Sequence, residues 1–201
     1  LKAELERRGQ RTAGGFIFED IWDRGNAEAL FAVTHRACRL LSGLGGRYLV
    51  IVPHVVPERI PLAGHSEASP RLDSQGWKTF LSLVNQVATI TRDEYGLFAT
   101  VHPHVATYLE FPDEIDRMAQ DIDPALVGLC LDTGHLIYAG ADPAALYRKY
   151  AAVTPHLHFK GVDRAIHARV MDENIDFHTA VIEGVFCPLG RGIVDFAAFK
   201  A

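Results

Sequence analysis

Histidines and carboxylates stand directly after several apolar runs of this 201-residue chain. The stretch 100–104 (TVHPH) carries two histidines, 131–135 (LDTGH) carries an aspartate and a histidine, and 156–160 (HLHFK) carries two histidines and a lysine. Imidazole and carboxylate groups are common ligands of divalent metals. Their recurrence after successive apolar runs predicts one shared metal-dependent site.

Strand-like and helix-like segments alternate along the chain, which is the pattern of a parallel sheet with helical crossovers. The apolar run 48–52 is continuous rather than alternating, as in a strand buried on both faces. A long loop over 53–76, rich in Pro, Ser and Gly, is the kind that often carries function. Strands are predicted at 13–18, 48–52, 96–101, 127–131 and 156–159, a further strand at 186–189, and helices at 27–44, 80–90, 112–121, 142–150 and 177–183, with a last helix capped by Asp195.

These segments predict most of a (β/α)8 TIM barrel, which has eight strands in about 250 residues. We expect one domain over residues 1–201, incomplete at both ends, with the first strand before Leu1 and the last after Ala201. An open doubly wound sheet is the alternative. A doubly wound fold that binds nucleotides has a glycine-rich phosphate loop after its first strand. Here Gly14 and Gly15 come before the apolar residues of the first predicted strand, so they do not form such a loop.

The composition narrows the possible partners. The net charge is −5 and no long basic run occurs, which disfavours a nucleic-acid partner. No apolar stretch approaches the roughly 20 residues that span a bilayer, so we expect no membrane partner. Cys38, Cys130 and Cys187 form no CxxC pair and predict reduced, mostly buried thiols in a cytoplasmic protein.

In a βα barrel the carboxyl ends of the strands face one mouth, where the active site lies. Polar residues from five strand ends would therefore converge. Several alternatives stay open. Asp132 also suits an Asx turn, and His156 competes with His158 because both point to the same face of the strand. His102 and His104 are also compatible with a structural role in the loop that Pro103 stiffens. The candidate residues are Glu19, Asp20, His54, His102, His104, Asp132, His135, His158 and Lys160.

The LDTGH motif at 131–135 resembles the xylose-isomerase-like TIM barrels, a superfamily of sugar isomerases, epimerases and endonuclease IV-type repair enzymes. Three stretches together are more specific and resemble its inosose dehydratases, the 2-keto-myo-inositol dehydratases of inositol catabolism. The resemblance covers most of residues 96–196. The three stretches are 101–104 (VHPH) with Thr107, 131–143 (LDTGHLIYAGADP) and 177–196 (FHTAVIEGVFCPLGRGIVDF).

The resemblance implies a divalent metal, commonly Mn²⁺, Co²⁺ or Mg²⁺, with Zn²⁺ as a further candidate. Its ligands in the superfamily are an acid after strand 4, an aspartate after strand 5, a histidine after strand 6 and a glutamate after strand 8. Asp132 and His158 match the second and third, and His102 or His104 stands at the first. The fourth has no counterpart in this chain. The usual acid after His-Leu-Lys is Gly161 here, for which Asp163 is a possible substitute.

The implied activity is a metal-dependent lyase acting on a polyhydroxy ketone or sugar. A base removes the α-proton, the metal stabilises the enediolate, and a general acid protonates the departing hydroxyl. Glu19, His54 and His135 are candidates for the proton transfers, and Lys160 for stabilising the oxyanion.

Three rival functions remain. The first is a keto-sugar isomerase or epimerase, which shares the metal and the enediolate. The second is an abasic-site endonuclease, which the negative charge disfavours. The third is a non-catalytic sugar-binding barrel. A homo-oligomer is also compatible with the sequence.

Overall fold

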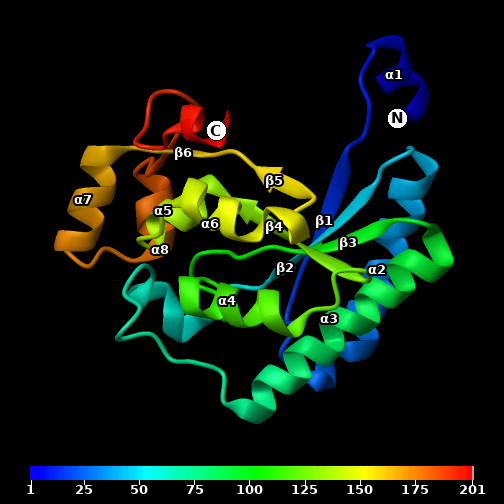
Figure 1. Cartoon of the computed structure of the whole chain (residues 1–201), viewed down its shortest axis with the longest axis horizontal. Helices are drawn as coiled ribbons and strands as arrows, with labels where there is room; N and C mark the ends of the chain where they lie inside the picture. The colour runs from blue at the N-terminus through cyan, green and yellow to red at the C-terminus, as the bar shows by residue number, and fades with distance from the viewer. Residues whose placement is uncertain (201) are drawn as a thin grey trace. The chain divides into compact units, whose positions relative to one another are not determined.

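A computed structural model describes residues 1–200, which divide into two compact units. The first unit comprises 1–54, 73–101 and 121–128, and the second comprises 55–72, 102–120 and the chain from 129 onward. The chain can be followed by colour in Figure 1. The expectation of a single domain over the whole chain stays a prediction.

The first unit contains a parallel sheet in which β2 lies between β1 and β3. Val50 of β2 stands opposite Phe16 on one side and Thr100 on the other. Residues 49–53 are all buried, which explains the unbroken apolar run of β2. The strands are β1 (Gly14–Glu19), β2 (Tyr48–Pro53) and β3 (Phe98–Val101); a short helix α1 (Lys2–Arg7) precedes them, and a 3-10 turn η1 (Arg24–Asn26) follows β1.

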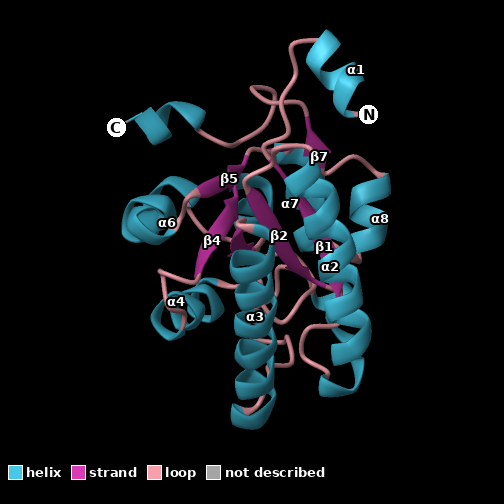
Figure 2. Cartoon of the chain, turned by 90° about the vertical axis from the view of Figure 1, so that its right-hand side faces the viewer, coloured by secondary structure: helices cyan, strands magenta, loops and turns pink. Residues whose placement is uncertain are grey.

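Two long helices, α2 (Ala27–Gly43) and α3 (Ser74–Tyr95), pack beside one another and against this sheet (Figure 2). Helix α3 begins at the Asp73 carboxylate, which accepts the Gly76 N–H at 2.7 Å. It ends at Gly96, whose φ of 64° is the left-handed cap that glycine favours. The buried face of α2 includes Thr34 and Cys38, whereas Leu40 is exposed.

The second unit continues the alternation of strands and helices. Strands β4 and β5 are parallel, with Asp132 opposite His158. Aspartates at 132, 142, 163 and 176 accept backbone N–H groups and begin four of its helices. The elements are η2 (Pro57–Leu62), α4 (Pro112–Asp121), β4 (Val127–Asp132), α5 (Thr133–Tyr138), α6 (Pro143–Tyr150), η3 (Ala151–Val153), β5 (His156–His158), β6 (Gly161–Val162), α7 (Arg164–Asp172), α8 (Phe177–Ile182), β7 (Phe186–Cys187) and η4 (Phe196–Lys200).

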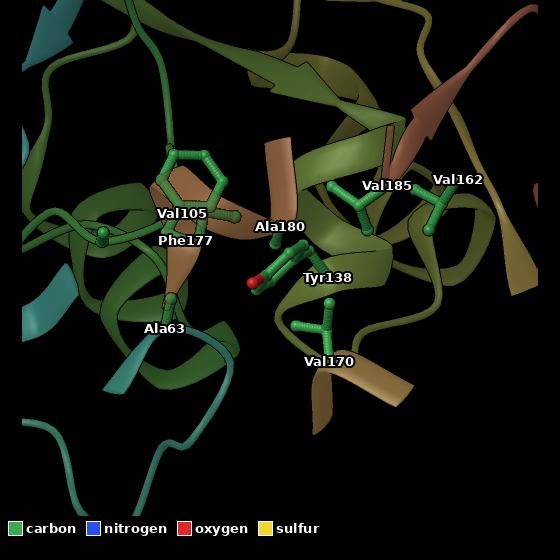
Figure 3. Packing of buried hydrophobic residues seen from close by; sticks show 9 residues of the cluster. Ala63, Val105, Tyr138, Val162, Val170, Phe177, Ala180 and Val185 are labelled. Carbon is green, nitrogen blue, oxygen red and sulfur yellow. The ribbon is translucent and has the colours of Figure 1, made fainter. Parts of the chain in front are cut away.

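An apolar cluster around Tyr138 forms the core of the second unit (Figure 3). Tyr138 lies close to Ala180 and Val170, while Val105, from the predicted histidine loop, lies beside Phe177. Residues from α5, α7, α8 and the segment after β3 thus share one core. This packing fixes the backbone that carries His104 and His135.

The five predicted parallel strands are confirmed, and the strand predicted at 186–189 is confirmed over 186–187 only. The strand found there, β7, is two residues long and pairs antiparallel with β6, so it does not continue the parallel series. Three helices, α1, α5 and α7, were not predicted from the sequence. Among residues 1–200, no helix combines the length and the apolar composition needed to cross a membrane.

Candidate metal centre

Four histidine rings pack together in the second unit, and we call them the histidine cluster: His102, His104, His135 and His158. The ring centroids of His104 and His135 are 3.9 Å apart, and those of His102 and His158 are 4.8 Å apart. His102 also lies 5.4 Å from His135. The sequence placed these residues after three different strands, and the structure brings them together.

Burial keeps most of the cluster uncharged. Burial lowers the pKa of His104 to about 4, and it lowers the pKa values of His102 and His135 well below the ordinary value, with smaller contributions from neighbouring rings and Lys160. His158 is more exposed, and burial lowers its pKa as well. A neutral imidazole keeps a nitrogen lone pair, which metal binding requires.

Two of the rings have their tautomer set by backbone carbonyls. Nδ1 of His102 lies 2.9 Å from the Cys130 carbonyl oxygen, and Nδ1 of His104 lies 2.7 Å from that of Val105. A carbonyl oxygen only accepts, so both Nδ1 atoms carry the proton and donate it. The lone pair is then on Nε2 in each ring. This is the arrangement in which a carbonyl orients a metal-binding histidine.

The two carboxylate oxygens of Asp132 have different roles. Oδ1 accepts the backbone N–H groups of Gly134 at 2.8 Å and His135 at 3.1 Å, and so begins α5. Oδ2 is buried and accepts no hydrogen bond, although Lys160 Nζ is 3.3 Å away and His158 Nδ1 is 3.8 Å away. The Asx-turn and ligand interpretations of Asp132 are therefore compatible, because each uses a different oxygen.

The donor set suits a divalent cation. A carboxylate oxygen of Asp132 and ring nitrogens of His102 and His135 all lie within 4.8 Å of one another. A buried carboxylate oxygen without a hydrogen bond is costly unless a cation or donor compensates it. Neutral imidazole nitrogens beside such an oxygen form the mixed set that Mn²⁺, Co²⁺ and Zn²⁺ accept. The group includes the predicted ligands His102 and Asp132, and its third member is His135 in place of the predicted His158.

The LDTGH motif positions Lys160. The Thr133 hydroxyl donates to the Lys160 carbonyl oxygen at 2.9 Å and accepts the Lys160 N–H at 2.8 Å. A Cβ at Gly134 would lie 2.8 Å from Cβ of Lys160, so this position requires glycine. Nζ of Lys160 lies 2.8 Å from Nε2 of His135. The motif therefore holds the backbone, the stem and the amine of this lysine.

His135 has a supporting place in this arrangement. An ammonium group only donates, so Nε2 of His135 accepts from Lys160. Lys160 Nζ, at 2.8 Å, is the nearer partner of this ring, and the Val105 N–H donates to Nδ1 over a long 3.5 Å. Because Lys160 uses the lone pair of His135, the nitrogen ligands nearest Asp132 that remain are His102 and His158.

A buried carboxylate that the sequence reading missed supports the loop that carries His104. Glu110 accepts the Ala106 N–H at 2.9 Å on one oxygen and the Gly64 N–H at 2.7 Å on the other. Ala106 has a φ of 62°, a left-handed conformation that a non-glycine residue adopts at some cost. Burial raises the pKa of Glu110 to about 7.

A buried ion pair lies in the same region. The Arg59 guanidinium is fully buried and donates to the Thr107 carbonyl oxygen and, at 3.0 Å, to Glu114 Oε1. Oε2 of Glu114 accepts the N–H groups of Glu110 and Phe111 at the start of α4. Arg59 lies in the Pro- and Ser-rich loop, where an arginine is usually exposed, so nothing in the sequence indicated this role.

Glu19 and His54 belong to the first unit. They stand at the ends of β1 and β2, where the His54 N–H donates to the Glu19 carbonyl oxygen at 2.9 Å. Nδ1 of His54 lies 3.2 Å from Oδ1 of Asp20, and both of these side chains are nearly half exposed. Their roles in proton transfer stay predictions.

The structure also places Gly161, Asp163 and His156, the residues of the remaining sequence alternatives. A Cβ at Gly161 would lie 2.6 Å from the Cys187 carbonyl oxygen, because β7 pairs closely there, and this explains the glycine. Asp163 uses Oδ1 to begin α7, accepting from Ala165 and Ile166. The ring of His156 lies 5.3 Å from that of His158, at the edge of the cluster.

Comparison with known proteins identifies the family of this chain. The profile of the family described as "Xylose isomerase-like TIM barrel" matches residues 12–201. The chain belongs to the xylose isomerase-like TIM barrel family. A member of this family with βα units and parallel strands is a partial (β/α)8 barrel, so the predicted fold is confirmed and the doubly wound alternative is wrong.

The relatives of this xylose isomerase-like barrel include proteins named inosose dehydratase. The one from Geobacillus kaustophilus is 32% identical over 206 residues, which is all of this chain and 66% of that relative. The one from Halalkalibacterium halodurans is 28% identical, over 98% of this chain and 64% of that relative. The chain thus spans just under two thirds of the length of these relatives.

A solved structure shows the same fold at low sequence identity. The crystal structure of "the probable 3-DHS dehydratase" of petrobactin synthesis from Bacillus anthracis is 14% identical, with a TM-score of 0.73. The match covers 98% of this chain and 67% of that one. At this identity the likeness supports the barrel fold alone.

Proposed function

We propose that this protein is a metal-dependent lyase that removes water from a polyhydroxy ketone, as an inosose dehydratase does. The observation that carries the proposal is the buried Oδ2 of Asp132, which accepts no hydrogen bond and lies beside neutral histidines, with the Lys160 ammonium 3.3 Å away. The relatives named inosose dehydratase supply the substrate class.

His102, Asp132 and His158 would hold the cation, with His104 as the competing ligand from the same loop. When bound, a divalent cation supplies Lewis-acid stabilisation of the negative charge that forms on a ketone oxygen as the neighbouring proton leaves. The mixed nitrogen and oxygen donors favour Mn²⁺ or Co²⁺, with Mg²⁺ and Zn²⁺ as further candidates.

Lys160 is the charged side chain best placed to meet the substrate. Its side chain is one-third exposed, whereas Asp132 and His135, which lie beside its amine, are buried. The amine also lies 4.7 Å above the ring of Phe186, which restricts its position further. We assign to Lys160 the stabilisation of the developing oxyanion, and to His135 the orientation of Lys160.

Dehydration also needs a base for the α-proton and an acid for the departing hydroxyl. We assign no direct proton transfer to His135, because Nζ of Lys160 lies 2.8 Å from its Nε2. Glu19 and His54 stay the candidates for direct proton transfer, from their sequence position after strands. A cytoplasmic location and a homo-oligomeric state also stay predictions of the sequence.

The test is product analysis with the full-length gene product, 2-keto-myo-inositol and Mn²⁺. We expect a product lighter by one water, and no product from Asp132→Ala. A product of unchanged mass with altered stereochemistry would instead establish the runner-up, a keto-sugar isomerase or epimerase, which needs the same α-proton removal. Substrate turnover that survives Asp132→Ala would contradict both.

A further inference from the structure

Cys130 lies on the same face of β4 as Asp132, because side chains two residues apart in a strand point the same way. Its side chain is fully buried. Its Sγ and one ring nitrogen each of His102 and His158 all lie within 4.8 Å of one another. Cys130 therefore offers a second anionic ligand to the two histidines assigned above to the cation of Asp132.

We propose that His102, Cys130 and His158 form a thiolate-containing metal site that takes a thiophilic divalent ion such as Zn²⁺. This set and the set containing Asp132 share both histidines, so only one of them is filled at a time. The protein would thus hold two overlapping sites of different preference, one with a carboxylate and one with a sulfur ligand.

The chemistry of the donors separates the two sites. Thiolate selects Zn²⁺ and Co²⁺ over Mg²⁺ and Mn²⁺, which favour oxygen ligands. Burial raises the pKa of the Cys130 thiol, and the nearby Asp132 raises it further. The thiol is therefore protonated before an ion binds, and binding requires that its proton leave to solvent. The thiolate then offsets part of the charge of the ion. The histidines are already suited to bind, because burial keeps them neutral.

Cys38 provides a matched control for Cys130. It is equally buried, and its Sγ lies 3.7 Å from the Thr91 hydroxyl. Among residues 1–200, two groups of histidine, cysteine and acidic side chains have ligand spacing, and Cys38 belongs to neither. A change at Cys38 thus removes a buried thiol without touching the proposed site.

The experiment is a Co²⁺ titration of the protein, followed by absorption spectroscopy. We expect a sulfur-to-cobalt charge-transfer band in the near ultraviolet for the unaltered protein and for Cys38→Ala, and no such band for Cys130→Ala. A band that persists in Cys130→Ala, or its absence from the unaltered protein, would overturn the proposal. Cys130→Ser serves if Cys130→Ala does not fold.

X-ray absorption at the cobalt edge of the unaltered protein gives an answer that depends on no variant. We expect one sulfur among the nearest neighbours of the ion, at about 2.3 Å as in zinc–thiolate sites. A shell of nitrogen and oxygen alone would contradict the proposal.

A last variant separates this site from the proposed function. Asp132→Asn removes the carboxylate set, so we expect it to abolish dehydration and to retain the sulfur-to-cobalt band. Cys130→Ala should weaken Zn²⁺ binding by about tenfold or more and change Mn²⁺ binding little. A band lost in Asp132→Asn would overturn the claim that the thiolate set works without Asp132.

Discussion

Polar side chains follow the strands of both units, yet they meet different surroundings. In the first unit Asp20 and His54 form a pair that is nearly half exposed. In the second unit Asp132 is 1% exposed and His102 is 3% exposed. Exposed charges are hydrated, whereas the buried Oδ2 of Asp132 has no hydrogen bond and has the Lys160 ammonium 3.3 Å away to offset its charge. The difference indicates that burial, more than residue type, marks the candidate metal centre.

The largest expected effect comes from removing the carboxylate of Asp132 in the second unit. Asp132→Asn should weaken Mn²⁺ binding by more than about 100-fold, since it removes a ligand rather than a supporting group. Asp20→Asn, the matched change in the first unit, should leave the affinity unchanged. Isothermal titration calorimetry measures both. Equal affinities in the two variants would remove the distinction between the units.

A second prediction concerns buried and exposed glutamates. The pKa of Glu110 is raised to about 7, so the folded state binds its proton more tightly than the unfolded state does. This contribution to stability is full below the ordinary pKa of about 4.5 and is lost as the pH rises to about 7. The loss is about 3 kcal/mol, because each pKa unit corresponds to about 1.4 kcal/mol.

Urea unfolding at a series of pH values checks this prediction. Glu110→Gln should remove that part of the pH dependence, since glutamine does not ionise. Glu28→Gln, at an exposed site in α2 of the first unit, should leave the pH dependence as it is. If Glu110→Gln has the same pH profile as the unaltered protein, the burial argument for Glu110 is wrong.

A third prediction compares two glycines. Gly134→Ala places a Cβ 2.8 Å from the stem of Lys160 and should destabilise the protein by about 1–3 kcal/mol. It should also lower kcat more than it raises KM, because it displaces a residue assigned to the developing charge. Gly43→Ala, in open space at the end of α2, should stabilise slightly, by about 0.5–1 kcal/mol. Thermal unfolding and steady-state kinetics test both variants. A Gly134→Ala variant with unchanged stability and unchanged kcat would refute the role of the LDTGH motif in positioning Lys160.

The smallest expected effect belongs to the exposed pair of the first unit. A double-mutant cycle on His54 and Asp20 should give a coupling energy of about 0–1 kcal/mol, as for other exposed ion pairs. A coupling well above that range would mean that this pair is more shielded from water than its exposure indicates.

Much of the fold follows from local pattern. The unbroken apolar run of β2 and the Asp142-Pro143 start of α6 each depend on a few neighbouring residues, and both were predictable. Helix α5 was missed because Asp-Thr-Gly also favours a turn, and the structure uses Asp132 both to cap the helix and to present an oxygen. The antiparallel pairing of β7 was not predicted, because two residues cannot show the direction of pairing.

The candidate site was predictable where strand topology places its residues. Topology alone brought Asp132, His102 and His158 to neighbouring strand ends. Arg59 lies 48 and 55 positions from Thr107 and Glu114, and Glu110 lies 46 positions from Gly64, so no local pattern links these partners. Cys130 was identified as a buried thiol, and the two-residue period of β4 places it on the face of Asp132.

Anomalous diffraction from crystals of the protein soaked in Mn²⁺ tests the metal centre most directly. We expect a peak in contact with Oδ2 of Asp132 and a ring nitrogen of His102. Anomalous density confined to exposed carboxylates such as Asp20, with none in the histidine cluster, would contradict the account.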